Sequence, residues 1–93
     1  MARTVYELEQ QRLLLCRRVA DNLDLLMGSV TTKGPKRPGH NLTRTVNGRT
    51  RSRHIRVQDL DKVRLMTGRY KTVRELLARI SDLNWRILLL QSE

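Results

Sequence analysis

The strongest constraint on the fold is a heptad pattern in the last third of the chain. From Val63 to Ile87, seam positions recur in alternating steps of three and four residues, which predicts a long helix with one packing seam. Leu76, Leu83 and Leu90 widen the apolar stripe on one side. The seam consists of Val63, Met66, Tyr70, Val73, Leu77, Ile80, Asn84 and Ile87. We therefore expect a helix from Gln58 to Gln91, within a dimerisation segment that covers residues 58–93.

Asn84 is the polar member of this seam, and two interpretations of it remain open. A buried polar pair is satisfied in one alignment of the partners only, so Asn84 would specify their register. Alternatively, the helix frays before its end and Asn84 faces water. Two charge pairs at i,i+4 spacing, Glu75–Arg79 and Asp82–Arg86, are expected to support the outer face of the same helix.

A second helix is predicted near the N-terminus. Thr4 and Glu7 have the spacing of a capping box, in which each side chain bonds the other residue's amide. Apolar residues then recur as far as Met27, and Gly28 is the residue type that often follows a helix end. The helix is therefore expected to end at Met27, inside a scaffold segment that covers residues 1–28.

The middle of the chain carries a strong hairpin signal. Asn47-Gly48 accepts the two positive φ angles of a type I′ turn, and β-branched residues flank it on both sides. One face of the hairpin is then apolar at its base, where Ile55 and Val57 are expected to pack on the helices, and arginine-rich toward its tip. The two-residue turn pairs Val46 with Arg49, Arg44 with Arg51, Leu42 with Arg53 and His40 with Ile55.

These elements together predict an α+β fold in one domain of residues 1–93. The order is an N-terminal helix, a basic β-hairpin within residues 29–57 and a long C-terminal helix, with a possible third strand at residues 29–32. Two long helices with wide apolar stripes cannot bury both stripes against each other alone. We therefore expect helical dimerisation, and a homodimer is the expected assembly.

The net charge of +10 is unevenly distributed along the chain. Residues 33–57 hold eight basic side chains and no acidic one, whereas the segments before and after them carry net charges of zero and +2. The basic side chains of this segment repel one another, and an anionic partner would neutralise them. The alternative is that the segment forms a solvated face. We therefore expect a nucleic acid as partner, and DNA rather than RNA, because a two-stranded ribbon fits the DNA major groove.

The residues expected to contact nucleic acid all lie in this segment. Arg44 lies opposite Arg51 in the predicted register, which is unfavourable unless phosphates lie between the two side chains. Cations in the loop of residues 33–39 would add contacts to the backbone of the nucleic acid. The predicted set is Lys33, Lys36, Arg37, Arg44, Arg49, Arg51, Arg53, His54 and Arg56.

Other classes of function find little support in the sequence. His40, His54 and Cys16 do not have the spacing of zinc ligands, so no metal site is expected, and Cys16 is expected to be a small core residue. No nucleophile motif or magnesium-binding acidic cluster is present, so we expect neither catalytic residues nor a cofactor, and no enzyme activity. Trp85 is expected to pack at the helix interface.

No membrane association is expected either. The longest apolar runs have four residues, far short of the roughly 20 that span a bilayer. The expected location is the cytoplasm, where association with the nucleoid is possible.

Four segments carry a resemblance to a family of small uncharacterised bacterial proteins that are often encoded near transposases or on other mobile elements. The segments are Gly28-Ser29-Val30, Val46-Asn47-Gly48-Arg49-Thr50-Arg51-Ser52-Arg53-His54-Ile55, Arg74-Glu75-Leu76-Leu77 and Asp82-Leu83-Asn84. The resemblance implies a long helix, a strand that starts at a glycine, a basic hairpin and a C-terminal helix. Many members have cysteines in the loop and Gly-Pro-Tyr before the second strand, whereas here the loop lacks cysteine and Pro38-Gly39-His40 takes that place.

The sequence therefore predicts a non-enzymatic nucleic-acid-binding protein that presents an arginine-rich β-ribbon on a helical homo-oligomer. Association with a mobile element is a further expectation from the resemblance. The alternative is a protein-interaction module, an inhibitor or adaptor, that docks its basic ribbon on an acidic protein or a ribonucleoprotein.

Overall fold

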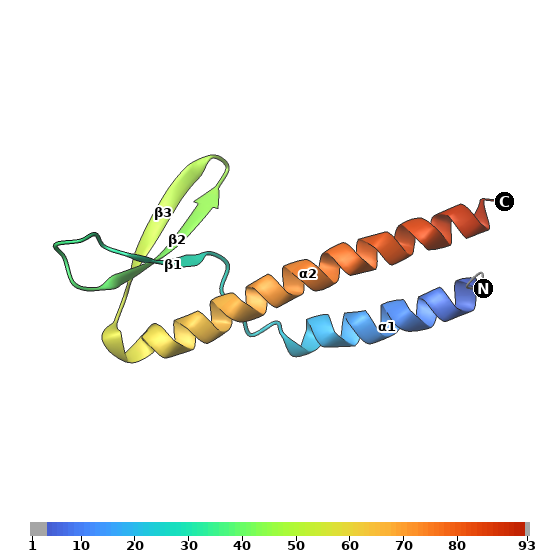
Figure 1. Ribbon diagram of the computed structural model, residues 1–93, viewed down its shortest axis with the longest axis horizontal. Coiled ribbons are helices and arrows are strands. Elements are labelled where there is room, and N and C mark those ends of the chain that lie inside the picture. The colour runs from blue at the N-terminus through green and yellow to red at the C-terminus, as the bar shows by residue number, and fades with distance from the viewer. Residues whose placement is uncertain (1–3, 93) are drawn as a thin grey trace. The chain divides into compact units, whose positions relative to one another are not determined.

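The computed structural model describes residues 4–92 and contains two helices and a three-stranded antiparallel sheet (Figure 1). The elements are α1 (Val5–Asp21), β1 (Ser29–Thr32), β2 (His40–Val46), β3 (Arg49–Ile55), the 3-10 turn η1 (Val57–Asp59) and α2 (Leu60–Gln91). The predicted α+β class, the hairpin and the third strand are confirmed. The chain divides into a helical unit, Met1–Leu23 with Thr72–Glu93, and a sheet unit, Asp24–Lys71.

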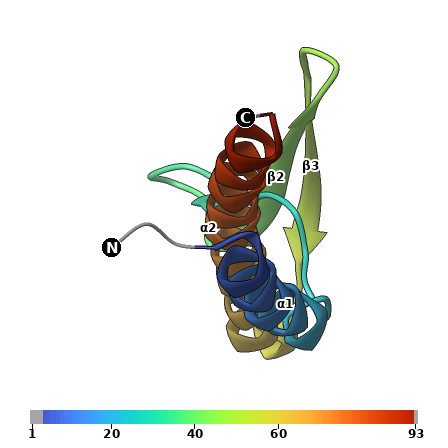
Figure 2. The same cartoon turned by 90° about the vertical axis from the view of Figure 1, so that its right-hand side faces the viewer.

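In the helical unit, α1 and the C-terminal part of α2 run antiparallel and side by side (Figure 1, Figure 2). Leu8 and Leu15 of α1 pack against α2, and Leu76 is 2% exposed. Leu76 and Leu83, which flank the predicted seam, therefore lie at the centre of the buried stripe. The buried cluster is Leu8, Leu15, Leu76, Leu83 and Ile87, with Val5, Val19, Ile80 and Leu90 packed around it.

This packing divides the predicted seam of α2. Val73 and Ile87 are buried within the chain, whereas Leu77 is 51% exposed and Asn84 is also exposed. Asn84 Oδ1 accepts a hydrogen bond of 2.8 Å from Arg12 Nη1 of α1. Because α2 continues to Gln91, the interpretation of Asn84 as part of a frayed helix end is wrong.

Two side chains assigned to the helix interior are exposed instead. Cys16 is exposed, and Trp85 is 60% exposed, so both predictions are wrong for the single chain. The reason is the angular step of about 100° per residue. Cys16 follows the buried Leu15 by one step, and Trp85 follows Leu83 by two steps, which turns each of them out of the interface between the helices.

The start of α1 agrees with the prediction and its end does not. Thr4 Oγ1 accepts a hydrogen bond of 3.1 Å from the amide of Glu7, as a capping residue does. The helix ends at Asp21 and not at Met27, because Asn22 caps it. The Asn22 amide donates to the Val19 carbonyl at 3.0 Å, and Asn22 Nδ2 donates to the Arg18 carbonyl at 2.7 Å.

The sheet forms in the predicted register. Asn47 and Gly48 have φ angles of 52° and 77°, as a type I′ turn requires, and all four predicted cross-strand pairs are present. β1 pairs antiparallel with β2, from Ser29 opposite Thr43 to Thr32 opposite His40. On one face, hydroxyl groups bond across the strands: Thr31 with Thr43 at 2.9 Å, Thr43 with Ser52 at 3.3 Å and Thr45 with Thr50 at 3.3 Å.

The apolar base of the hairpin is smaller than predicted. Ile55 is buried as expected, but Val57 is 86% exposed, so its predicted packing is wrong. Val57 begins η1, and the Asp59 amide closes that turn by donating to the Arg56 carbonyl at 2.9 Å. The alternation of side chains along β3 therefore stops before Val57.

The helical core provides a direct test of this packing. Leu76→Ala should lower the free energy of unfolding by about 2–5 kcal/mol, because the change leaves a cavity between α1 and α2. Leu65→Ala, at a residue that is 52% exposed, should cost far less. Urea unfolding followed by circular dichroism measures both, and equal losses would show that Leu76 is not at the centre of the core.

Candidate nucleic-acid interface

The positive charge is concentrated in one of the two units. The sheet unit holds twelve lysines and arginines against three aspartates, which is +9 of the total charge of +10. The helical unit holds seven basic and six acidic residues and has a net charge of +1. An anionic partner would therefore be attracted to the sheet unit.

Arginines gather on one face of the hairpin, which we call the arginine face. Arg44 lies directly opposite Arg51, and the pairs Val46–Arg49 and Leu42–Arg53 lie on the same side of the sheet. All four arginines are exposed, and among residues 4–92 none of them has a carboxylate within 4 Å. Like charges directly opposite each other destabilise a strand pair, so an anionic ligand would relieve the repulsion.

Two carboxylates of the sheet unit, Asp24 and Asp59, pair with cations outside the arginine face. Asp24 Oδ2 lies 2.9 Å from Arg69 Nη1 and 3.6 Å from Lys62 Nζ. Asp59 Oδ2 accepts a hydrogen bond of 2.7 Å from Arg56 Nε. Arg56 is also a predicted contact residue for nucleic acid. It has a carboxylate partner, whereas the four arginines of the arginine face have none among residues 4–92.

A hollow of about 370 Å³ opens on the arginine face. Leu42 and Val46 of β2 contribute apolar surface to it, and so do two residues that precede β1. Leu26 and Met27 are not among the predicted site residues, because their apolar character continues the pattern of the predicted N-terminal helix. The lining residues are Leu26, Met27, Leu42, Arg44, Val46, Arg51 and Arg53.

Gly28 positions one wall of this hollow. Its φ angle is +129°, and a Cβ atom there would lie 2.7 Å from the Thr43 carbonyl oxygen and 3.2 Å from Leu42 Cδ1. Glycine is therefore required for the close approach of this backbone to β2, and not as a helix stop as predicted. The amide of Leu26 also donates to the Met66 carbonyl at 3.1 Å, which ties the same segment to α2.

The remaining predicted contact residues lie apart from the arginine face. His54 belongs to the hydroxyl-bearing face, since it is paired with Asn41. Lys33, Lys36 and Arg37 are exposed in the loop at the opposite end of β2 from the turn. With a rise of about 3.3 Å per strand residue, β2 spans roughly 20 Å. The structure thus brings Arg44, Arg49, Arg51 and Arg53 together on one face. Lys33, Lys36 and Arg37 form a separate cationic group in the loop.

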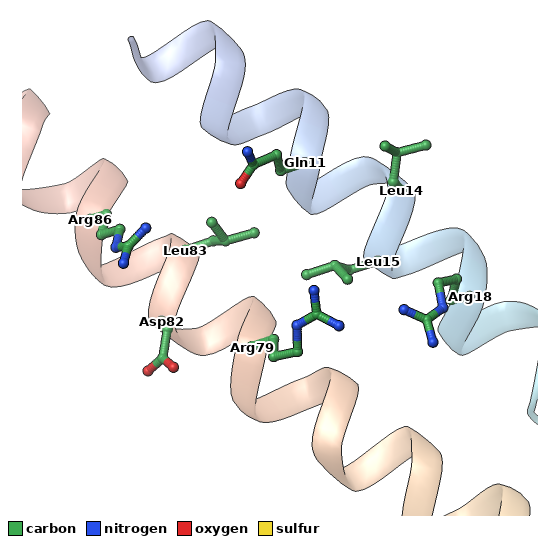
Figure 3. A pocket seen from close by; sticks show the side chains of 8 residues that line it. All are labelled: Gln11, Leu14, Leu15, Arg18, Arg79, Asp82, Leu83 and Arg86. Atoms are coloured by element: carbon green, nitrogen blue, oxygen red, sulfur yellow. The ribbon is translucent and has the colours of Figure 1, made fainter. Parts of the chain in front are cut away.

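A second hollow, of about 480 Å³, lies between α1 and α2 in the helical unit (Figure 3). Arg18 and Arg79 extend toward this groove, and Asp82 points away from α1 (Figure 3). Within the described chain neither Glu75–Arg79 nor Asp82–Arg86 forms an ion pair, so the predicted i,i+4 pairs are wrong. The groove is lined by Gln11, Leu14, Leu15, Arg18, Arg79, Asp82, Leu83 and Arg86.

Comparison with protein-family models, with curated proteins and with solved structures finds no match for this chain. In the part of the chain that the structure describes, no three His, Cys, Asp or Glu side chains are grouped to hold a metal ion. Across residues 4–92, no helix has both the length and the apolar character needed to cross a bilayer. The features that indicate a function are therefore the geometry and the charge of the sheet unit.

Proposed function

We propose that this protein binds DNA through the arginine face of its β-hairpin and catalyses no reaction. The observation that carries the proposal is the pairing of Arg44 with Arg51 on a face whose arginines have no carboxylate partner among residues 4–92. Phosphates placed between these guanidinium groups would neutralise them, and arginine is well suited to bidentate contacts with phosphate.

The dimensions and polarity of the hairpin favour nucleic acid over a protein partner. A two-stranded ribbon has the width to enter a DNA major groove, so side chains of both faces would meet the groove walls. The face opposite the arginines carries Thr45, Thr50 and Ser52 as exposed hydroxyls. Hydroxyl groups of this kind commonly donate hydrogen bonds to phosphate oxygens and thereby fix the register of a protein on DNA.

The helical unit supports the proposal of a homodimer. Each helix has a row of core residues that faces the other helix. Because successive residues are about 100° apart, the neighbouring residues form one flank on either side of that row. Gln11 and Arg18 lie on one flank of α1, Arg79 and Arg86 lie on one flank of α2, and together these two flanks line the charged groove between the helices. The remaining flank of α1 and the remaining flank of α2 therefore lie together on the opposite side of the helix pair. We call this side the apolar flank, and it consists of Leu13, Cys16, Ala20, Leu77 and Leu88.

A second copy of the chain is the proposed occupant of the apolar flank. Leu13, Leu77 and Leu88 are each 44–51% exposed, and two packed helices alone bury little apolar surface. The net charge of the helical unit is only +1, so two copies repel each other weakly. The bonded pair Arg12–Asn84 borders this flank and would restrict the register of the two copies.

The salt dependence of DNA binding tests the proposed function. Four free ribbon arginines per chain give a dimer eight, of which five or more reaching phosphates would produce a log–log slope of roughly −4 to −7. Fluorescence anisotropy with a labelled duplex measures this slope, after bound nucleic acid has been removed in high salt. A slope shallower than about −2 would instead favour docking of the ribbon on an acidic protein or a ribonucleoprotein.

The nucleic acid carried through purification provides an independent check of the same proposal. Protein purified at low salt should show a raised ratio of absorbance at 260 nm to that at 280 nm, because bound nucleic acid absorbs at the shorter wavelength. A wash in high salt should return the ratio to that of the protein alone, since counterions then compete for the arginines. A ratio that is normal at low salt and does not change would count against DNA binding.

A further inference from the structure

We infer that the hollow on the arginine face receives an unpaired nucleobase, so that the site prefers single-stranded DNA to fully paired DNA. The inference rests on the proposed function and adds a class of substrate to it. A base inside a duplex is stacked on both faces and paired at its edge, so it cannot enter a hollow without first leaving the helix. A single strand offers its bases at no such cost.

The floor of the hollow has the chemistry of a base site. Leu26, Leu42 and Val46 are half-buried, and Met27 is 44% exposed, so apolar surface lies between the arginines. Contacts to phosphates alone would not require this floor, because phosphates meet only the guanidinium groups. The flat apolar faces of a base would cover it, and the flexible thioether of Met27 adapts to rings of different size.

The rim of the hollow complements the groups on either side of such a base. Arg44 and Arg51 face each other across the two strands, and Arg53 lies opposite Leu42. Guanidinium planes stack on bases and also form bidentate contacts with phosphate. One ring on the floor, with its two flanking phosphates on the rim, would therefore use both the apolar and the charged part of the site.

The wall of the hollow is held in place before any ligand arrives. Arg69 Nη1 donates to the Asp24 carbonyl at 3.1 Å and to Asp24 Oδ2 at 2.9 Å, at the start of the segment that carries Leu26 and Met27. The Leu26–Met66 hydrogen bond and the close approach at Gly28 hold the rest of the segment. A site that is ordered in advance loses little conformational entropy on binding, which favours the small contact area of a single base.

The experiment compares one labelled single-stranded DNA with the duplex made from it, at equal salt. The unchanged protein should bind the single strand about tenfold more tightly, which corresponds to about 1.4 kcal/mol for placing one base on the apolar floor. The double variant Met27→Ser, Val46→Thr should weaken binding to the single strand about tenfold and leave the duplex within about twofold. The salt slope should not change, because no arginine is altered.

Leu65→Ser is the matched control, since Leu65 is an exposed leucine of the sheet unit that does not line the hollow. Equal affinity of the unchanged protein for single-stranded and duplex DNA would overturn the inference, and so would equal losses in the control and the double variant. Failure of the proposed function is a different result, the absence of binding to either form of DNA at low salt.

A second measurement does not depend on the fold of any variant. A single-stranded DNA that contains the fluorescent base 2-aminopurine should change its emission when the unchanged protein binds, because the base moves from water to an apolar floor. Unlabelled single strand should reverse this change. An emission that stays constant while anisotropy reports binding would show that phosphates alone are bound, and would overturn the inference.

Discussion

Replacing Arg44, Arg51 and Arg53 together by serine should lower the affinity for DNA by at least about a hundredfold at moderate salt. Each arginine that contacts a base or phosphate contributes about 1–3 kcal/mol, so three losses per chain exceed that factor even at the low end. The fold should persist, because exposed arginines contribute little to stability and two of these three repel each other in the free protein. Anisotropy measures the affinity, and circular dichroism and light scattering confirm the fold and assembly.

A triple replacement in the helical unit is the matched control for this prediction. Arg17, Arg18 and Arg79 are also exposed, and their replacement by serine removes the same charge from the other unit. The control should retain most of the affinity. An equal loss in both triple variants would show that binding depends on net charge and not on the arginine face.

Leu77→Asp should dissociate the proposed homodimer into folded monomers. Burying the exposed half of a leucine contributes about 0.8–1.5 kcal/mol, and a symmetric dimer contains two copies, so the loss of these contacts should raise the dissociation constant by about one to two powers of ten. Burying an unpaired aspartate would add to the loss. Because Leu77 is half-exposed in the single chain, the helical pair should remain folded. The salt slope of DNA binding should fall to about half, since a monomer presents half of the arginines.

Two further variants separate dissociation from unfolding. Leu14→Asp changes an exposed leucine on the side of the charged groove and should leave the dimer intact. Ile80→Asp places a charge against the core cluster and should unfold the helical unit. Analytical ultracentrifugation with circular dichroism distinguishes the three results. Dissociation by Leu14→Asp, with no effect of Leu77→Asp, would place the interface on the groove side.

The two predictions concern different units of the chain. The sheet unit carries almost all of the net charge and the arginine face, whereas the helical unit is nearly neutral and carries the apolar flank. Loss of arginines should therefore change DNA binding without changing assembly. Loss of Leu77 should change assembly first and DNA binding only through the number of arginines that each particle presents.

The hairpin and the cap of α1 were determined by the sequence alone. A type I′ turn needs two residues that tolerate positive φ, and Asn47-Gly48 meets that need without help from the rest of the chain. Once the turn is placed, the period of two along each strand assigns every residue to a face, so Arg44 had to lie opposite Arg51. The bond from the Glu7 amide to Thr4 is equally local.

Only the tertiary structure decided which stripe of α2 is buried and where α1 ends. Leu76 and Leu77 both belong to heptad-spaced stripes, and their spacing along one helix cannot show which of them meets a partner. Contact with Leu8 and Leu15 of α1 selects Leu76 and leaves Leu77 exposed. The apolar pattern likewise continues through Leu26, whose amide bonds to Met66, far away in the sequence. The hollow on the arginine face depends on that long-range hydrogen bond and on the close approach at Gly28. The spacing of apolar residues along the chain predicts neither of them.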